Sequence, residues 1–395
     1  MKISKHSCTG CGVCSLICPK DCIKMQLDKL GMLIPEVSST QCIHCGSCIA
    51  QCPQNNPVEF HEPLGCYAAW SKHITDYVYS ASGGVAAEIA RFQIKYNSVI
   101  YGCDYDKNGD LFHFRVTKET DIPRLQSSKY SQSTAYTCYQ MIKKDLLSNI
   151  SVVFIGTPCQ VAGLLRYLKA DHSNLITVDL VCHGTPPNTY LKNYLLSLGI
   201  DSPYDRIRFR GEFDQQLTIW KNGRIVYQKD KSTDPYFAAF YKNMISYNAC
   251  YTCQYATSKR VADITIGDFW GLKDLRSIRK MSNRPSLIMT NTAKGQQYFN
   301  ALASQLIFEE RDLIEGITGN GRLMAPPGKN RSAKLFQKFY RVCSGDFLST
   351  VKCVNRIEFF ISHLFRSINY PRKIYSLGIR LLKKIYKLLC FKEVK

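Results

Sequence analysis

The first part of the chain takes its fold from the stretch Cys8-Thr-Gly-Cys11-Gly-Val-Cys14-Ser-Leu-Ile-Cys18-Pro19, in which cysteines follow the spacing C-x2-C-x2-C-x3-C-P. The same spacing recurs as Cys42-Ile-His-Cys45-Gly-Ser-Cys48-Ile-Ala-Gln-Cys52-Pro53. Three cysteines two residues apart can wrap one loop around a cube of iron and sulfide, and the fourth, just before a proline, reaches the other cluster. Two complete copies, each with a loop glycine, argue against a zinc knuckle or a disulfide framework. We therefore assign one 4Fe-4S cluster to Cys8, Cys11, Cys14 and Cys52, and a second to Cys42, Cys45, Cys48 and Cys18.

Length and cysteine content fit a large protein of a reducing compartment. At 395 residues the chain can bury a full core and form two or more domains. Of its 19 cysteines the two motifs use eight, and the odd total does not suit a disulfide framework. The first ligand at residue 8 leaves no room for a signal peptide, and no window approaches the roughly 18 apolar residues of a membrane span. We expect a cytoplasmic protein.

Positive charge gathers in the C-terminal tail, residues 331–395. This tail holds 15 Lys or Arg and three Asp or Glu, a net +12 of the chain's +21. Because no recognition motif accompanies the charge, we do not expect nucleic-acid binding. Apolar residues at helical spacing predict one amphipathic helix over 351–368 and another after Pro371. Such basic helices can lie on an anionic membrane surface, so residues 350–395 could contact the inner face of the membrane. The simpler interpretation, which we favour, is that the helices dock on the protein and expose their basic face to solvent.

Residues 1–60 are predicted to form a bacterial-type ferredoxin module with two clusters. Between the motifs, residues 23–27 and 32–37 flank the turn Asp28-Lys29-Leu30-Gly31 and are typical of a hairpin. Cys22 lies outside both motifs, and we interpret it as a small buried residue. Residues 53–65 contain three prolines and two adjacent asparagines, which indicates a linker.

A second body begins near Cys66, and its first region is predicted to span residues 66–145. The turn Ser80-Ala-Ser82-Gly83-Gly84 precedes a helical pattern over 85–94. A glycine-rich turn that opens a helix suits a phosphate, although many ordinary loops also contain Gly-Gly. Residues 98–105 and 111–117 are predicted strands.

The next region, residues 146–328, has the βαβα pattern of a parallel sheet. Strands are predicted over 151–155 and 175–181, and helices over 161–169 and 190–198, the first capped by Thr157 and Pro158. Parallel strands joined by right-handed crossovers are expected, hence an α/β (α+β) body. Cys159 and Cys182 each follow the carboxyl end of a strand, where open α/β sheets bind ligands.

A further cysteine pair, Cys250-Tyr-Thr-Cys253, precedes Asp263-Ile-Thr-Ile-Gly-Asp268-Phe-Trp-Gly271. Two ligands do not fill a tetrahedral site, but Cys159 and Cys182 would complete four. A third 4Fe-4S cluster, a four-cysteine zinc site and coincidence are equally compatible with spacing alone. The remaining cysteines lack partners at motif spacing and are interpreted as structural: Cys66, Cys103, Cys138, Cys343, Cys353 and Cys390.

Several segments resemble one known family. These are Gly156-Thr-Pro-Cys-Gln-Val-Ala-Gly-Leu164, Asp179-Leu-Val-Cys-His-Gly-Thr-Pro186 and the stretch 263–271, together with Ser82–Gly84 and Ser128–Ser133. In them the chain resembles the coenzyme F-420 hydrogenase/dehydrogenase beta-subunit family. That family includes hydroxymethyl-chlorophyll a reductase and ferredoxin-fused proteins encoded with bacterial polysaccharide genes. The resemblance covers residues 66–325, and the tail from residue 331 falls outside it.

The resemblance implies cofactors and ligands. It implies FAD and a 4Fe-4S cluster within the second body, the cluster held by Cys159, Cys182, Cys250 and Cys253. It assigns to FAD the segments that contain Ser82, Gly83, Gly84, Lys129, Gln132 and Ser133. Asp268 would approach the flavin or brace its loop.

The resulting hypothesis is an iron–sulfur flavoprotein oxidoreductase, with the ferredoxin module in front and a helical basic tail behind. Clusters move single electrons and a flavin collects two, so the chain would relay electrons to or from a redox partner protein or a small-molecule hydride acceptor. Lys129 would stabilise flavin or phosphate charge, unless it is a solvated lysine. His183 would deliver a proton, although a structural histidine is the simpler interpretation. The alternative is a non-catalytic electron-transfer subunit that serves a partner enzyme, in either case in surface-polysaccharide biosynthesis.

Overall fold

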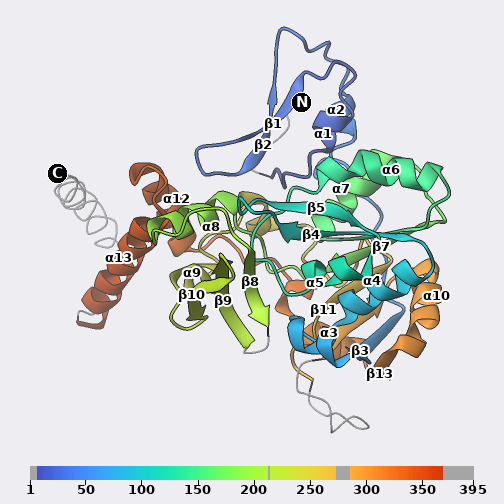
Figure 1. Cartoon of the computed structure of the whole chain (residues 1–395). Coiled ribbons are helices and arrows are strands. Elements are labelled where there is room, and N and C mark those ends of the chain that lie inside the picture. The colour runs from blue at the N-terminus through green and yellow to red at the C-terminus, as the bar shows by residue number, and fades with distance from the viewer. Residues whose placement is uncertain (1–6, 212–213, 273–284, 368–395) are drawn as a thin grey trace.

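The ferredoxin module stands on one side of the molecule in this computed structural model, which describes residues 7–211, 214–272 and 285–367 (Figure 1). It contains short helices α1 (Val13–Leu16) and α2 (Ser47–Ala50) and the antiparallel strands β1 (Ile23–Leu27) and β2 (Leu33–Val37). The Asp28 carboxylate accepts the backbone N–H groups of Leu30 (2.8 Å) and Met32 (2.9 Å), which fixes the turn. The predicted hairpin is confirmed.

An eight-stranded mixed sheet organises the second body, in the order β13-β3-β12-β11-β7-β6-β4-β5. Its four central strands, β4, β6, β7 and β11, are parallel, and antiparallel strands flank them on both sides. Strands from both predicted regions, 66–145 and 146–328, lie in this one sheet. The strands are β3 (Gly65–Ser71), β4 (Val99–Tyr105), β5 (Leu111–Val116), β6 (Val152–Gly156), β7 (Leu175–Leu180), β11 (Ile264–Asp268), β12 (Ser286–Thr290) and β13 (Leu306–Glu310).

Helices cover both faces of the sheet, as a buried parallel sheet requires (Figure 1). Alternate residues of β6 enter opposite cores: Val152 and Phe154 pack with α6 and α7, whereas Val153 packs with α4 and α10. The predicted α/β fold is confirmed. The helices of this body are α3 (Ile74–Tyr79), α4 (Val85–Lys95), α5 (Ile122–Leu125), α6 (Tyr139–Leu147), α7 (Pro158–Leu168), α10 (Ala293–Leu302) and α11 (Leu313–Thr318).

A three-stranded antiparallel sheet, which the sequence analysis did not predict, lies beside the main sheet. It consists of β8 (Arg206–Gly211), β9 (Asp214–Lys221) and β10 (Arg224–Asp230), and α8 (Asn188–Ser197) and α9 (Pro235–Tyr241) pack against it. Phe209 and Leu217 are fully buried in that core, whereas β10 is almost wholly exposed. The three strands were not predicted because only one face of each carries apolar residues, so charged residues dominate these segments in the sequence.

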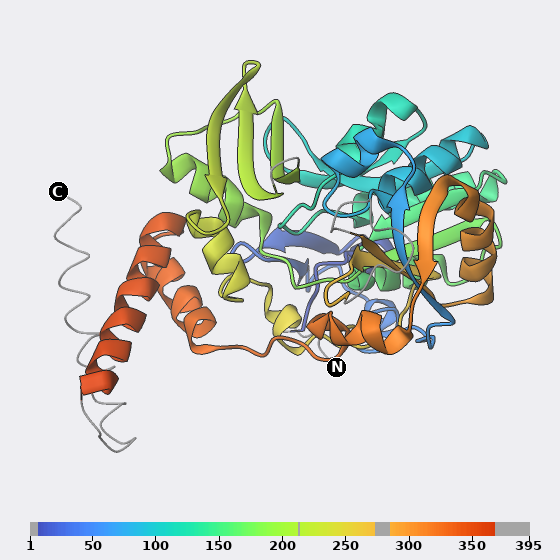
Figure 2. The ribbon, with the colours of Figure 1, turned by 90° about the horizontal axis from the view of Figure 1, so that it is seen from below.

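Two C-terminal helices, α12 (Arg331–Val342) and α13 (Phe347–Ser367), join the same core. Figure 2 shows them beside the smaller sheet, away from the eight-stranded one. Phe336, Phe347 and Val354 are fully buried, so this part of the tail is docked, as the favoured interpretation held. The helix predicted after Pro371 lies outside the described residues. In the described part of the chain, no helix combines the length and apolar character needed to cross a membrane.

Candidate functional site

A cavity of about 640 Å³ lies at the carboxyl edge of the parallel strands. Gly102 and Cys103 of β4, Gly156 at the end of β6, Leu180 of β7 and Gly267 of β11 all line it. This is the edge at which open α/β sheets bind ligands, and the volume lies in the usual range of cofactor sites. The sheet therefore forms the floor of a candidate cofactor site.

The glycine-rich turn before α4 forms one wall of this cavity. Ser82 and Gly84 line it, and Gly84 has the left-handed φ of 83° that precedes the first turn of α4. Gly83 does not line the cavity. A Cβ atom there would lie 2.1 Å from the Ala69 carbonyl oxygen, so Gly83 is required by the close approach of the turn to β3. Of the three predicted residues, two face the cavity and one supports them.

Lys129 and Ser133, which the resemblance assigns to FAD segments, line the cavity on another side. The Lys129 ammonium donates to the carbonyl oxygens of Arg124 (2.8 Å) and Gln126 (2.9 Å). Burial lowers the pKa of Lys129, while Cys103 and Asp104 oppose that shift. Two backbone acceptors thus hold the ammonium of this half-buried lysine at the cavity wall.

Asp268 lines the cavity and forms a short ion pair with Arg210. Arg210 comes from β8 of the smaller sheet and is only 4% exposed. The ion pair therefore joins the two sheets, which matches the bracing role considered for Asp268. The Asp268 side chain also faces the cavity. Arg210 was missed because its partner is 58 residues away in sequence.

His183 lines the large cavity and also the smaller cavity next to it. Desolvation lowers its pKa; Arg322 and Arg210 add to that shift and Asp268 opposes it. Burial therefore favours the neutral form of the imidazole. It lies directly after Cys182 and faces both compartments.

His113 of β5 is a cavity residue that the sequence analysis missed. Its Nε2 donates to the Ile155 carbonyl oxygen at 2.9 Å, and its Nδ1 is buried without a hydrogen-bond partner. Burial lowers the pKa of His113 to about 4. The neutral ring, protonated on Nε2, leaves Nδ1 as an acceptor for a ligand O–H or N–H group. A histidine within a strand pattern gave no signal of this role.

The smaller cavity, of about 30 Å³, is lined by all four cysteines proposed for the third site: Cys159, Cys182, Cys250 and Cys253. Cys159 lies in the first turn of α7, Cys182 follows β7, and the other two lie around a 3-10 turn, Asn248–Thr252. Desolvation and neighbouring thiols raise the pKa of Cys182 to about 12 and that of Cys250 to about 11. All four are free thiols. The chain thus brings together the ligand set that was assembled from distant segments.

Cys8, Cys11, Cys14 and Cys52 line a third cavity, of about 20 Å³, in the ferredoxin module. This grouping is the cross-motif set assigned to the first cluster, with Cys52 coming from the second motif. Desolvation raises the pKa of Cys8 to about 12 and that of Cys11 to about 11. A thiolate ligand must lose its proton, so cluster insertion would reverse these protonation states.

In the second ligand set, Cys45 is exposed, and Cys18, Cys42 and Cys48 are half-buried. Desolvation raises the pKa of Cys48, and the nearby thiols of Cys45 and Cys18 raise it further. Cys22 is buried, as predicted, but its Sγ is also 3.3 Å from the Cys18 Sγ. In the described residues, no group of three or more His, Cys, Asp or Glu is arranged to hold a single metal ion.

Gln132, which the resemblance assigns to an FAD segment, does not line the large cavity. It lines the four-cysteine cavity instead. Its Nε2 donates to the Thr9 carbonyl oxygen at 3.1 Å, and its Oε1 accepts from the Thr185 hydroxyl in a short hydrogen bond. The side chain therefore lies between the ferredoxin module and the second body.

The ferredoxin module and the cysteine-lined cavities define an iron–sulfur electron-transfer protein of the oxidoreductase class. Residues 7–56 match the family model of the 4Fe-4S dicluster domain, and residues 150–315 match that of the C-terminal part of the coenzyme F420 hydrogenase/dehydrogenase beta subunit. These segments belong to those two families, which confirms the resemblance and the ferredoxin-fused arrangement.

The search of curated proteins finds no match. Among solved structures, a chain of the F420-reducing nickel–iron hydrogenase complex from Methanosarcina barkeri is similar, with 15% sequence identity and a TM-score of 0.44. The alignment covers 74% of this chain and 91% of that one.

Proposed function

We propose that this protein is an iron–sulfur flavoprotein oxidoreductase. In this proposal the ferredoxin module holds two 4Fe-4S clusters, Cys159, Cys182, Cys250 and Cys253 hold a third, and the large cavity holds FAD. Bound clusters would supply single-electron transfer to or from a bound flavin, and the flavin would supply exchange with a partner protein or a small-molecule hydride acceptor. The resemblance alone suggests that this exchange serves surface-polysaccharide biosynthesis.

One observation carries the proposal: the cavities adjoin one another in the order that a relay requires. Thr9 lines both the ferredoxin cavity and the four-cysteine cavity. Cys182, His183 and Thr185 line both the four-cysteine cavity and the large one. An electron that enters the ferredoxin module therefore has a continuous series of neighbouring sites toward the carboxyl edge of the sheet, and the reverse direction uses the same series.

The chain has groups that fit FAD in the large cavity. The turn Ser80–Gly84 directs the N-terminus of α4 to one wall, where backbone N–H groups and the helix dipole favour a phosphate. Lys129 adds a positive charge, and His113 Nδ1 is a buried acceptor with no hydrogen-bond partner among the residues that the structure describes. An unpaired buried polar atom costs free energy, so a ligand donor at Nδ1 would remove that cost.

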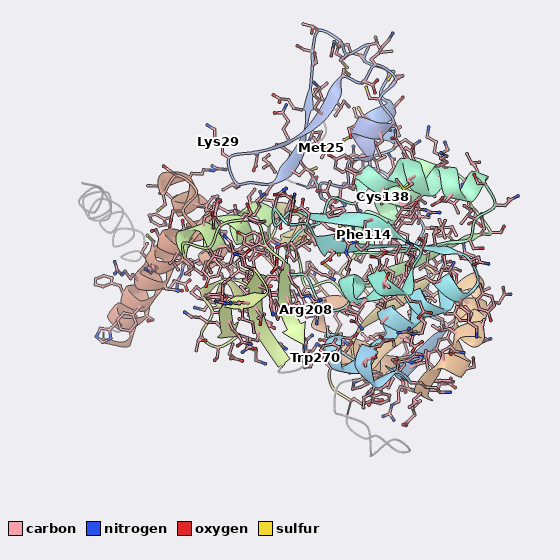
Figure 3. The ribbon with its side chains drawn as sticks, in the orientation of Figure 1. Met25, Lys29, Phe114, Cys138, Arg208 and Trp270 are labelled. Atoms are coloured by element: carbon pink, nitrogen blue, oxygen red, sulfur yellow. The ribbon has the colours of Figure 1, made fainter. Side chains whose placement is uncertain are left out.

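The side chains of this cavity can perform distinct tasks. A bound flavin supplies the exchange between one-electron and two-electron steps. His183, which lines both cavities, can take or give a proton where they meet. Lys129 balances negative charge, and the Arg210–Asp268 pair fixes the smaller sheet against the cavity. Trp270, 45% exposed, brings one wall of the cavity to the surface, on the side away from the ferredoxin hairpin that carries Met25 (Figure 3).

We also propose that the protein works in the reducing cytoplasm. Every cysteine in the described residues is a free thiol, which suits cluster ligation and a compartment without disulfides.

Anaerobic purification with iron, sulfide, zinc and flavin measured per chain tests the proposal. About twelve irons and one FAD are expected from three clusters and one flavin. About eight irons with zinc present would refute the third cluster, and absence of flavin would refute the flavoenzyme. Reduction of the bound flavin by a small-molecule donor would support an enzyme, whereas flavin that stays inert until a second protein is added would favour the electron-transfer subunit.

A further inference from the structure

Two glutamine side chains cross from the second body to the ferredoxin module next to cluster ligands. Gln132 donates from Nε2 to the Thr9 carbonyl oxygen, and Thr9 follows Cys8 directly. Gln254 donates from Nε2 to the Pro53 carbonyl oxygen at 2.8 Å, and Pro53 follows Cys52 directly. Both acceptors therefore belong to residues bonded to ligands of the same ferredoxin cluster.

On the other side, both glutamines are tied to the four-cysteine site. Gln254 follows Cys253 directly. Gln132 accepts the hydroxyl hydrogen of Thr185, and Thr185 lines the four-cysteine cavity together with Cys182 and Cys250. The backbone N–H of Gln132 donates to the Pro186 carbonyl oxygen at 2.8 Å, which fixes the glutamine on the loop that carries Cys182.

We propose that Gln132 and Gln254 are the electron-coupling bridges between the ferredoxin cluster at Cys8, Cys11, Cys14 and Cys52 and the four-cysteine site. The proposal rests on the proposed function, because it assumes a cluster at the second of these sites. In the step concerned, one electron leaves the first site, which is oxidised by one electron, and enters the second, which is reduced by one. No atom is transferred, and an external low-potential one-electron donor supplies the electron.

The chemistry of the bridges explains why glutamine suits these positions. Hydrogen bonds couple two redox sites better than a gap between surfaces does, because the electronic wavefunction decays faster through space than through bonds. A glutamine carries a donor and an acceptor at the end of a neutral chain, so Gln132 can hold Thr9 and Thr185 together without adding charge between the sites. It is 8% exposed, so water does not replace these contacts.

The bridges are distinct from the contacts that merely dock the module. The Leu33 N–H donates to the Tyr247 hydroxyl at 2.9 Å, Arg166 donates to the Pro57 carbonyl oxygen at 2.7 Å, and Thr189 donates to the Gly31 carbonyl oxygen at 3.4 Å. On the module side these contacts involve Leu33, Pro57 and Gly31, none of which is adjacent in sequence to a ligand cysteine. Loss of one bridge therefore leaves docking contacts in place.

The test uses three variants: Gln132→Leu, Gln254→Leu and the double variant that carries both changes. The control is Thr189→Val, which removes a docking hydrogen bond away from the clusters. Each full-length protein is first assayed for iron, and limited proteolysis of residues 53–65 monitors docking. Single electrons are then introduced with a reduced viologen radical, and transfer from the ferredoxin clusters to the four-cysteine site is followed by absorbance. Magnetic interaction between the reduced sites is recorded by electron paramagnetic resonance.

We expect a several-fold slower transfer and a weaker magnetic interaction in each single glutamine variant, a larger loss in the double variant, and wild-type behaviour in Thr189→Val. Transfer in the double variant as fast as in Thr189→Val would overturn the inference while the iron count still supports three clusters. Loss of iron in both single variants would overturn it too, since the glutamines would then hold the sites together rather than couple them. About eight irons in the wild type would instead refute the proposed function.

Discussion

His113 has a charge state that is set by where it lies in the sheet. Its ring stacks on Phe154, donates to the Ile155 carbonyl oxygen and is only 4% exposed. In such a place the charged imidazolium loses its hydration, so the pKa falls to about 4 from an ordinary 6.5. Because the folded pKa lies below the unfolded one, this residue's contribution to stability is complete above pH 6.5 and is lost as the pH falls toward 4.

We expect His113→Gln to make stability less sensitive to acid. A glutamine can still donate to the Ile155 carbonyl oxygen but does not titrate. The wild type should lose about 2 kcal/mol between pH 7 and pH 5 through this histidine, an upper value that the variant should not lose. Calorimetric Tm values of both proteins at pH 7, 6 and 5 check this. Parallel decreases in Tm would show that His113 is already charged or solvated in the folded state.

Lys129 offers a second test at the residue scale. Lys129→Met keeps the apolar stem but removes the ammonium that is held by the Arg124 and Gln126 carbonyl oxygens. If the charge faces a bound flavin, the flavin Kd should rise about tenfold, the loss expected for one hydrogen bond to a charged group. Fluorescence titration of deflavinated protein measures this Kd. Lys129→Arg serves as a control that keeps the charge, and equal Kd values in all three proteins would remove Lys129 from the site.

At the scale of elements, helix α7 connects the sheet to the ferredoxin module. Its Gly163 lies where a Cβ atom would be 2.9 Å from the Tyr139 hydroxyl and 3.0 Å from the Cys11 Cβ. The helix thus approaches the loop that holds the first ligand set, and only a residue without a side chain leaves that room. Gly163 is part of the motif that first indicated the family resemblance.

Gly163→Val should weaken docking of the ferredoxin module. Overpacking of a close contact costs about 1–3 kcal/mol, which corresponds to a markedly larger fraction of undocked module. Faster proteolysis within residues 53–65, at an unchanged fold of the second body by circular dichroism, would report it. The control is Gly321→Ala, since a Cβ atom at Gly321 meets nothing within 4 Å. Equal proteolysis of both variants would contradict a tight approach of α7.

Elements with a strong local signal could be predicted from the sequence. The strand–turn–helix over 151–168 was evident because Val152–Phe154 is a continuous apolar run and Thr157 and Pro158 mark the helix start, and the structure adds a capping box from Thr157 to Gln160. The sheet β8–β10 was missed because its apolar face is formed by Phe209, Leu217 and a few others among charged neighbours. Alternation of apolar and polar residues is a weak signal for a strand when the helix that packs on its apolar face is distant in sequence.

The site shows the same division. Cysteines carry their chemistry in their spacing, so the set at Cys8, Cys11, Cys14 and Cys52 could be assigned before the structure. Roles that depend on long-range contacts could not. The family resemblance assigned Gln132 to an FAD segment together with Lys129 and Ser133, yet its side chain turns to Thr9, 123 residues away.

At the scale of the whole molecule, the ligand sets differ in how they meet solvent. Cys45 of the second ligand set is exposed, whereas the cavity lined by Cys8 and Cys11 shares Thr9 with the four-cysteine cavity of the second body. The large cavity reaches the surface elsewhere, at Trp270. Under the proposed function, an external one-electron partner would approach the second ligand set and a hydride acceptor would approach the large cavity, so single electrons and a hydride would use separate entrances.

This separation predicts that the two entrances can be uncoupled by one substitution between them. Cys253→Ser removes one ligand of the four-cysteine site, so iron should fall from about twelve to about eight per chain, with both ferredoxin clusters retained. Flavin reduction by a one-electron donor at the ferredoxin end should then slow severely. Direct reduction of the flavin by a small hydride donor should stay within about twofold of the wild type, because its entrance does not pass the missing ligand.

Stopped-flow absorbance with each donor gives the two rates, and Cys343→Ser, a change outside all cysteine-lined cavities, is the control. If Cys253→Ser leaves both rates unchanged, electrons reach the flavin without the four-cysteine site and the order of the relay is wrong; if it abolishes both, that site holds the large cavity together rather than conducting to it.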